Sequence, residues 1–123
     1  MRRILLSFSM LLPLATASAQ FSEQFTDGDF TATPSWTGNT NDFIVNASSQ
    51  LQSNNTIASS SYYLSTANTM ITSTQWEFYV QFDFNTSSTN YADVFLAASA
   101  SDLTDVNTNG YFVRIGNTSD EIS

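Results

Sequence analysis

Nine consecutive residues, Trp76–Phe84, alternate strictly between apolar and polar side chains. The apolar positions are Trp76, Phe78, Val80, Phe82 and Phe84, and the positions between them are Glu77, Tyr79, Gln81 and Asp83. A helix would scatter the apolar groups around its circumference, whereas a strand places alternate side chains on one face. We therefore predict a β-strand over this range, with its apolar face in the core of an all-β fold.

Further strands are predicted along the chain at Phe43–Val45, Tyr62–Leu64, Tyr91–Ala98 and Tyr111–Ile115, with the start of another at Glu121–Ser123. Polar turns separate these short segments, and none of them has a helical apolar period, so we expect an antiparallel β-sandwich. Because the strand signal runs to Ser123 without a closing turn, we expect the N-terminal part of a longer protein. The alternative is a complete seven-strand sandwich of about 100 residues.

The first nineteen residues have the order of a secretory signal peptide. Arg2 and Arg3 precede an apolar run over residues 4–14, and a small-residue cleavage signature follows at Ala17–Ala19. The apolar run is too short for a transmembrane helix, which needs ~20 apolar residues. We expect residues 1–19 to be removed and residues 20–123 to form a secreted or cell-surface domain without a transmembrane segment.

The charge and composition of the mature chain exclude several classes of function. Arg114 is the only cation left after cleavage, against 11 carboxylates, for a net charge of −10. Such a chain repels nucleic acids. The sequence has no His and no Cys, which excludes a Ser-His-Asp triad, an imidazole metal site, a thiol nucleophile and a zinc knuckle. We expect no nucleic-acid partner.

A glycosidase pair on the alternating strand is also excluded by distance. Glu77 and Asp83 are six residues apart, or ~20 Å at ~3.3 Å per residue. The two carboxyl groups of a glycosidase lie only ~5–9.5 Å apart. We therefore expect no catalysis within these residues.

Pairing Trp76–Phe84 with Tyr91–Ala98 predicts a polar outer face. The hydrophobic pattern sets the register, because a slip of one residue would reverse the two faces. The inner face then contains Phe78, Val80, Phe82, Val94, Leu96 and Ala98. The outer face collects Glu77, Tyr79, Gln81, Asp83, Tyr91, Asp93 and Phe95. If the next strand pairs with Tyr91–Ala98, Phe112 and Arg114 join this face. Aromatic rings stack on sugar C–H faces, and amides and carboxylates bind hydroxyls. This face predicts a site for a neutral polysaccharide; the alternative is an ordinary solvent face with cross-strand pairs.

An acidic turn near the start of the mature chain predicts a structural calcium ion as cofactor. Glu23, Asp27 and Asp29 supply three carboxylates within seven residues, and calcium takes oxygen ligands from such turns. The spacing of an EF-hand is absent, and a solvated turn is the alternative. Asp102, Asp105 and Asn107 form a weaker second set.

Several motifs resemble the start of large secreted surface proteins of Bacteroidetes. They are Phe25–Phe30, Pro34–Gly38, Asp42–Val45, Asn109–Gly116 and Asp120–Ser123. Those proteins often begin with a concanavalin-A-like (laminin-G-like) sandwich, followed by lamin-tail or other surface modules and a type IX secretion sorting domain. The resemblance implies a jelly-roll, concanavalin-A-like sandwich and an extracellular location.

These observations favour a non-catalytic secreted or cell-surface module that binds glycans, acts in adhesion or supports neighbouring modules of the same chain. The alternative is the N-terminal accessory part of a secreted hydrolase, either a glycan hydrolase or a nuclease, whose catalytic residues lie beyond Ser123.

Overall fold

The computed structural model describes residues 21–117 and 122–123. The predicted signal peptide lies outside the described residues. In chain order the elements are β1 (Thr37–Gly38), the 3-10 helix η1 (Thr40–Asp42), β2 (Phe43–Val45), β3 (Leu51–Ser53), β4 (Leu64–Ser65), β5 (Ala92–Ala98) and β6 (Gly110–Ile115). No helix in the described part of the chain is long and apolar enough to cross a membrane.

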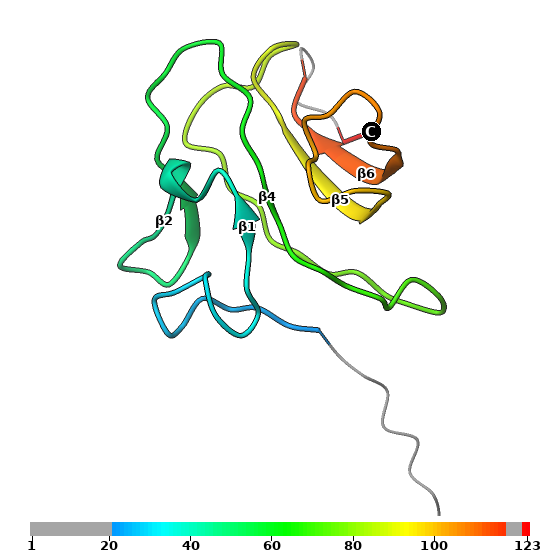
Figure 1. The fold of residues 1–123 in the computed structure, drawn as a ribbon. Helices are drawn as coiled ribbons and strands as arrows, with labels where there is room; N and C mark the ends of the chain where they lie inside the picture. The colour runs from blue at the N-terminus through cyan, green and yellow to red at the C-terminus, as the bar shows by residue number, and fades with distance from the viewer. Residues whose placement is uncertain (1–20, 118–121) are drawn as a thin grey trace, which may run out of the picture.

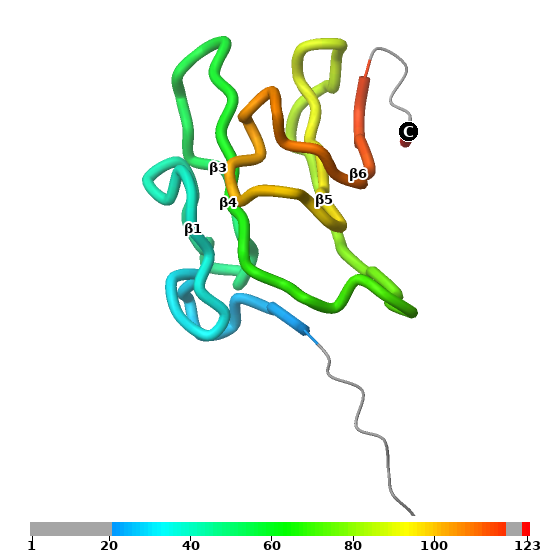
Figure 2. Tube along the Cα trace, turned by 45° about the vertical axis from the view of Figure 1, so that its right-hand side comes forward, coloured from blue at the N-terminus to red at the C-terminus, as the bar shows by residue number. Residues whose placement is uncertain are grey.

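The strands form three small antiparallel sheets, β1–β4, β2–β3 and β5–β6. The first two lie on one side of the molecule and the β5–β6 hairpin lies on the other (Figure 1, Figure 2). The prediction of an all-β fold is therefore confirmed. The finer prediction of a jelly-roll sandwich stays a prediction, because the described residues form three two-stranded sheets.

The β2–β3 hairpin confirms the strand predicted at Phe43–Val45, and Asn46 is the first residue after it. Val45 pairs with Leu51, and the chain reverses between them. The Asn46 side-chain oxygen accepts hydrogen bonds from the backbone N–H groups of Ser48 at 2.9 Å and Gln50 at 3.1 Å. Asparagine favours such turns because its side chain mimics a backbone acceptor.

The strand predicted at Tyr62–Leu64 is displaced toward the C-terminus. Only Leu64 and Ser65 pair, with the two residues of β1. Tyr63 is instead tied to Asn39, whose backbone N–H donates to the Tyr63 carbonyl at 2.9 Å. A second hydrogen bond joins the same two residues, because the Asn39 side-chain oxygen accepts from the Tyr63 N–H at 3.1 Å.

The β5–β6 hairpin confirms the strands predicted at Tyr91–Ala98 and Tyr111–Ile115, within one residue at each start. It also corrects the predicted face of Ala98. A β-bulge shifts the register between Phe95 and Ala97, so that Ala97 pairs with Tyr111 and Ala98 with Gly110. A bulge sets two residues against one on the partner strand. Ala98 is thereby moved off the face predicted for it.

A short third segment extends this sheet beyond β6. Ile122 forms an antiparallel bridge with Ile115. Arg114 and Ser123 exchange backbone hydrogen bonds of 2.8 and 3.0 Å. Ile122 and Ser123 therefore pair as the predicted start of another strand, whereas Glu121 lies outside the described residues.

The strand predicted at Trp76–Phe84 does not form. In the described part of the chain, no backbone hydrogen bond joins this segment to another one. Its side chains nevertheless alternate between two sides. The hydrogen bonds of the Gln81 side chain to those of Tyr79 and Asp83 show this, since all three must lie on the same side. The segment is thus extended but unpaired, and the predicted hairpin with Tyr91–Ala98 is wrong.

The turn that follows the segment explains why it does not pair. Residues Ser87–Asn90 close a tight turn with two backbone hydrogen bonds of 3.0 and 3.1 Å. Continuing this pairing outward would set Phe82 opposite Phe95 and Gln81 opposite Leu96. The hydrophobic pattern requires Phe82 beside Leu96 instead. A register wrong by one residue puts polar groups on the apolar face, so turn and pattern are incompatible.

This explanation predicts that one added residue will let the strand pair. Inserting one serine between Asn85 and Thr86 would bring Phe82 opposite Leu96. We expect three or four new cross-strand pairs to raise the free energy of unfolding by about 1–2 kcal/mol. Urea unfolding and amide hydrogen exchange over residues 78–84 measure this. Two inserted serines restore the mismatch and are the matched control, and equal effects of both insertions would refute the explanation.

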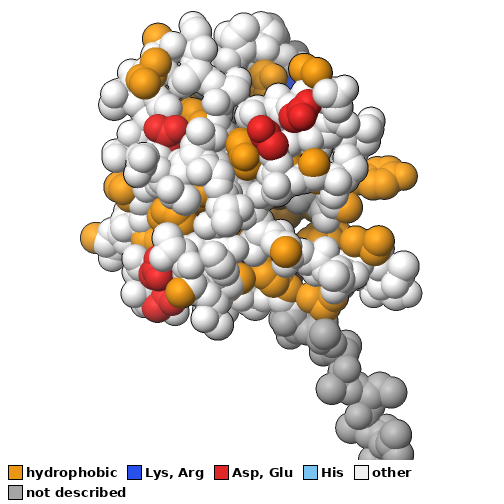
Figure 3. All heavy atoms as spheres, viewed as in Figure 1, with side chains coloured by type: hydrophobic (Ala, Val, Ile, Leu, Met, Phe, Trp, Pro, Cys, Tyr) orange, Lys and Arg blue, Asp and Glu red, His pale blue; other side chains and the backbone are white. Residues whose placement is uncertain are grey.

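The apolar side chains form several small groups rather than one core. Phe30, at 8% exposure, is the only buried hydrophobic side chain in the described residues. Ring pairs lie elsewhere, among them Phe43 with Tyr62 at 5.4 Å between centroids. Apolar atoms reach the surface at several places on the face in Figure 3. Trp76 and Phe78 were predicted to point into the core, but they are 36% and 43% exposed because their strand is unpaired.

Candidate functional site

The seven residues of the predicted polar face that were expected to bind a glycan fall into two groups. Tyr79, Gln81 and Asp83 lie on the unpaired extended segment and are named here the Tyr79 row. Tyr91, Asp93, Phe95 and Arg114 belong to the β5–β6 hairpin. In the described residues, no hydrogen bond, ion pair or ring contact joins the two groups. The predicted single face is therefore wrong, because it required the hairpin that the Ser87–Asn90 turn prevents.

The Tyr79 row is a line of hydrogen-bonded side chains on one side of the extended segment. The Tyr79 hydroxyl donates to Gln81 Oε1 at 3.1 Å, and Gln81 Nε2 donates to Asp83 Oδ1 at 2.9 Å. Tyr79 is 76% exposed, so its ring is open to solvent. Gln81 and Asp83 still have capacity for a further partner, because a carboxylate accepts several hydrogen bonds and an amide has two N–H groups. The row combines an open ring with groups that bind hydroxyls.

The group on β5–β6 is centred on an ion pair between directly opposite residues. The register sets Asp93 opposite Arg114. Arg114 donates from Nε to Asp93 Oδ1 at 2.7 Å and from Nη2 to Oδ2 at 2.8 Å. These hydrogen bonds raise the pKa of Arg114. Arg114 was predicted beside several carboxylates, and in the described residues it is paired with one, Asp93.

Aromatic rings complete this group. The Arg114 Cζ atom lies 4.0 Å from the centroid of the Tyr91 ring and 5.6 Å from that of Phe112. Phe112 in turn packs on Phe95, with 5.0 Å between ring centroids. A guanidinium over a ring face is attracted by the ring quadrupole. One face of Tyr91 and both oxygens of Asp93 are thus already occupied, so this group stabilises the hairpin and offers little to a ligand.

In the acidic turn predicted to bind calcium, the carboxylates accept hydrogen bonds from residues two positions later in the chain. Glu23 accepts from the Phe25 N–H at 2.7 Å, and Asp27 accepts from the Asp29 N–H at 3.1 Å. Asp29 accepts from both the N–H and the hydroxyl of Thr31, each at 2.8 Å. The backbone hydrogen bond from Thr31 is the main reason why the pKa of Asp29 is lowered.

The second acidic set repeats this pattern. Asp102 accepts from the N–H and hydroxyl of Thr104, and the hydroxyl bond is the main cause of its lowered pKa. Asp105 accepts from the backbone and side chain of Asn107. Across residues 21–117 and 122–123, no group of three or more Asp, Glu, His or Cys side chains is placed to hold a metal ion. Calcium binding by Glu23, Asp27 and Asp29 stays a prediction without a converging ligand set.

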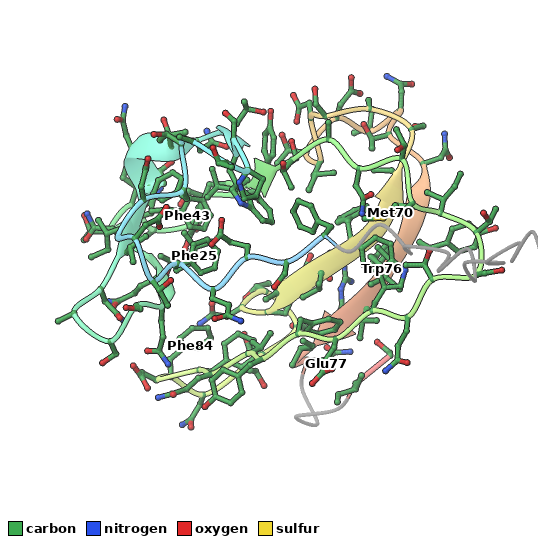
Figure 4. All side chains as sticks on the ribbon, turned by 90° about the horizontal axis from the view of Figure 1, so that it is seen from below. Phe25, Phe43, Met70, Trp76, Glu77 and Phe84 are labelled. Atoms are coloured by element: carbon green, nitrogen blue, oxygen red, sulfur yellow. The ribbon has the colours of Figure 1, made fainter. Side chains whose placement is uncertain are left out.

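A groove that the sequence analysis did not name lies beside the β5–β6 hairpin. Its apolar end is a hollow of about 270 Å³ lined by Ile71, Trp76, Leu96, Ala97 and Tyr111. A larger hollow of about 750 Å³ shares three of these residues and adds Asn68, Thr69, Ala98, Ser99, Asn109 and Gly110. We call the two together the Trp76–Tyr111 groove, and Figure 4 draws Trp76 beside the hairpin. The alternation of side chains in the sequence could have indicated these two rings, since Trp76 and Tyr111 each lie on the predicted apolar side of a strand.

No known protein family, curated protein or solved structure matches the chain.

Proposed function

We propose that this chain is a non-catalytic, secreted or cell-surface β-sandwich module that binds neutral glycans. The observation that carries the proposal is the Tyr79 row, in which an exposed ring, an amide and a carboxylate follow one another along an extended segment. A tyrosine ring provides a flat apolar surface for the C–H face of a sugar and keeps a polar hydroxyl at its edge. The amide and carboxylate supply the donors and acceptors that sugar hydroxyls need.

Charge favours a neutral ligand over an anionic one. Arg114 is the only cation of residues 20–123, and Asp93 engages it through two hydrogen bonds. An anionic polysaccharide would meet a chain with 11 carboxylates and no uncommitted cation. Like-charged partners are repelled at long range, so uronic-acid and sulfated polymers are disfavoured.

Export and the sandwich fold are part of the same proposal. The signal-peptide pattern at residues 1–19 supports secretion. The antiparallel hairpins support a β-sandwich, since such folds are built from hairpins with polar turns. The resemblance to the N-terminal region of secreted Bacteroidetes surface proteins is consistent with both.

The test replaces Tyr79 by alanine and measures binding to soluble neutral polysaccharides, namely hydroxyethyl cellulose, galactomannan and arabinoxylan. We expect Tyr79→Ala to weaken binding at the Tyr79 row at least about tenfold, equivalent to about 1.4 kcal/mol. Tyr79→Phe keeps the ring and should bind within about twofold of the natural protein.

Val106→Ala is the control, because Val106 is exposed in a different loop. Affinity electrophoresis with polygalacturonate beside the neutral polymers tests the charge argument. The proposal fails if the natural protein binds none of the neutral polymers, or if it binds the anionic one more tightly.

A further inference from the structure

We propose that the Trp76–Tyr111 groove is a second glycan-binding site, shaped for a short stretch of a neutral oligosaccharide. This inference rests on the proposed function, and it adds a location that lies apart from the Tyr79 row. Trp76 and Tyr79 are an odd number of residues apart on the extended segment, so their side chains point to opposite sides of it. The two sites therefore face different directions and can be tested separately.

The apolar end of the groove offers aromatic surface over a floor of small and aliphatic groups. Trp76 is 36% exposed and Tyr111 is 80% exposed. The floor comes from Leu96 and Ala97, which are neighbours in the chain but line the same hollow. The register shift between Phe95 and Ala97 accounts for this, because a bulge turns two successive side chains toward one side. Two rings that line the same hollow as these groups can hold the C–H faces of a sugar.

The polar end carries the hydrogen-bonding groups that hydroxyls require. Asn68 Oδ1 accepts from the Met70 N–H at 2.8 Å, which leaves the two N–H groups of its amide to donate. Asn109 Nδ2 donates to the Asn107 carbonyl at 3.0 Å, which leaves its Oδ1 to accept. Ser99 Oγ accepts from the Asn109 N–H at 2.9 Å and keeps its own proton. A sugar hydroxyl both donates and accepts, so it matches this mixed set.

The absence of charge in the lining selects the class of ligand. Among residues 21–117 and 122–123, no Asp, Glu or Arg side chain lines either hollow of the groove. An anionic or cationic ligand would find no partner there, and burying an unpaired charge is costly. A purely apolar ligand would leave the amides and hydroxyls at the polar end without partners. A neutral oligosaccharide satisfies both ends.

The experiment titrates the ¹⁵N-labelled protein with three neutral hexasaccharides, cellohexaose, xylohexaose and mannohexaose. NMR follows the indole N–H of Trp76 and the backbone amides of the Tyr79 row. We expect at least one sugar to shift the Trp76 indole signal. Tyr111→Ala should weaken the binding reported by that signal at least about tenfold, and Tyr111→Phe should retain it, because stacking needs the ring and not the hydroxyl.

Asn109→Ala should weaken the same binding severalfold, and Tyr79→Ala should leave it unchanged. Tyr111 is mostly exposed, so its substitution should not unfold the protein, and circular dichroism checks this. If sugars shift the Tyr79 row but not the Trp76 indole, the groove inference fails and the proposed function stands. If a sugar shifts the indole signal equally in Tyr111→Ala, the groove inference fails as well. If no sugar shifts either set, both proposals fail.

Discussion

Replacing Phe30 with alanine is expected to lower the free energy of unfolding by about 3 kcal/mol, at the lower end of the usual range for truncation of a buried Phe. Phe30 is the one hydrophobic side chain that the described residues bury, at 8% exposure. Its carbonyl also accepts a hydrogen bond of 2.9 Å from the Trp36 N–H, which places Phe30 beside an aromatic cluster. Trp36 packs there against Phe21 and Phe25, each at 6.3 Å between ring centroids. Removing the Phe30 ring would leave a cavity that this cluster cannot fill without moving.

The matched control for Phe30→Ala is Ile57→Ala. Ile57 is also a large apolar residue outside the strands, but it is 72% exposed. Its truncation should change the free energy of unfolding by no more than about 0.5 kcal/mol. Urea unfolding followed by tryptophan fluorescence measures both variants. Equal losses would mean that the Phe30 environment contributes no more than a surface contact.

Gly116→Ala is the second change with a large expected effect. Gly116 is buried and has a backbone φ of +93°, a region that residues with a Cβ rarely adopt. An added Cβ would also lie 2.6 Å from Thr86 Cγ2, far inside van der Waals contact. Backbone strain and overpacking together should cost about 2–4 kcal/mol of the free energy of unfolding. Thermal unfolding of the two proteins measures the loss.

Gly28→Ala separates the two causes. Gly28 has a φ of +78°, but nothing lies within 4 Å of the Cβ position. Its replacement by alanine should therefore show the backbone strain alone, about 1 kcal/mol. Thr86→Ser removes the methyl group nearest to the added Cβ, so it should recover part of the Gly116→Ala loss. If Gly116→Ala costs no more than Gly28→Ala, the close approach of Thr86 does not constrain the fold.

Local features of the fold were predictable from local sequence. The strand at Phe43–Val45 ends where Asn46 turns the chain, and the side-chain hydrogen bonds of Asn46 act within four residues. The same holds for Asp29 and Asp102, which each bind the residue two positions later. Such contacts depend on neighbours in the chain, so a pattern of residue types is sufficient to predict them.

The strongest pattern in the sequence also led to a wrong prediction of strand pairing. Alternation over Trp76–Phe84 correctly predicted an extended segment whose side chains take opposite sides. It carried no information on which strand the segment would pair with. That was decided by the Ser87–Asn90 turn, whose register conflicts with the apolar pattern of β5. The predicted polar face is wrong for the same reason, and its members form two separate groups, the Tyr79 row and the group around the Asp93–Arg114 pair.

The sequence by itself determined the all-β character, the alternation of sides along each extended segment and the scarcity of cations that leaves Arg114 as the only one in residues 20–123. These properties depend on side-chain type and on neighbours in the chain. Only the tertiary structure decided which segments pair, where the bulge at Leu96 falls and that Trp76 and Tyr111 line one groove. Trp76 and Tyr111 are 35 residues apart in the sequence. Whether two such distant residues meet depends on the register of every turn between them, because a shift of one residue exchanges the two faces of a strand.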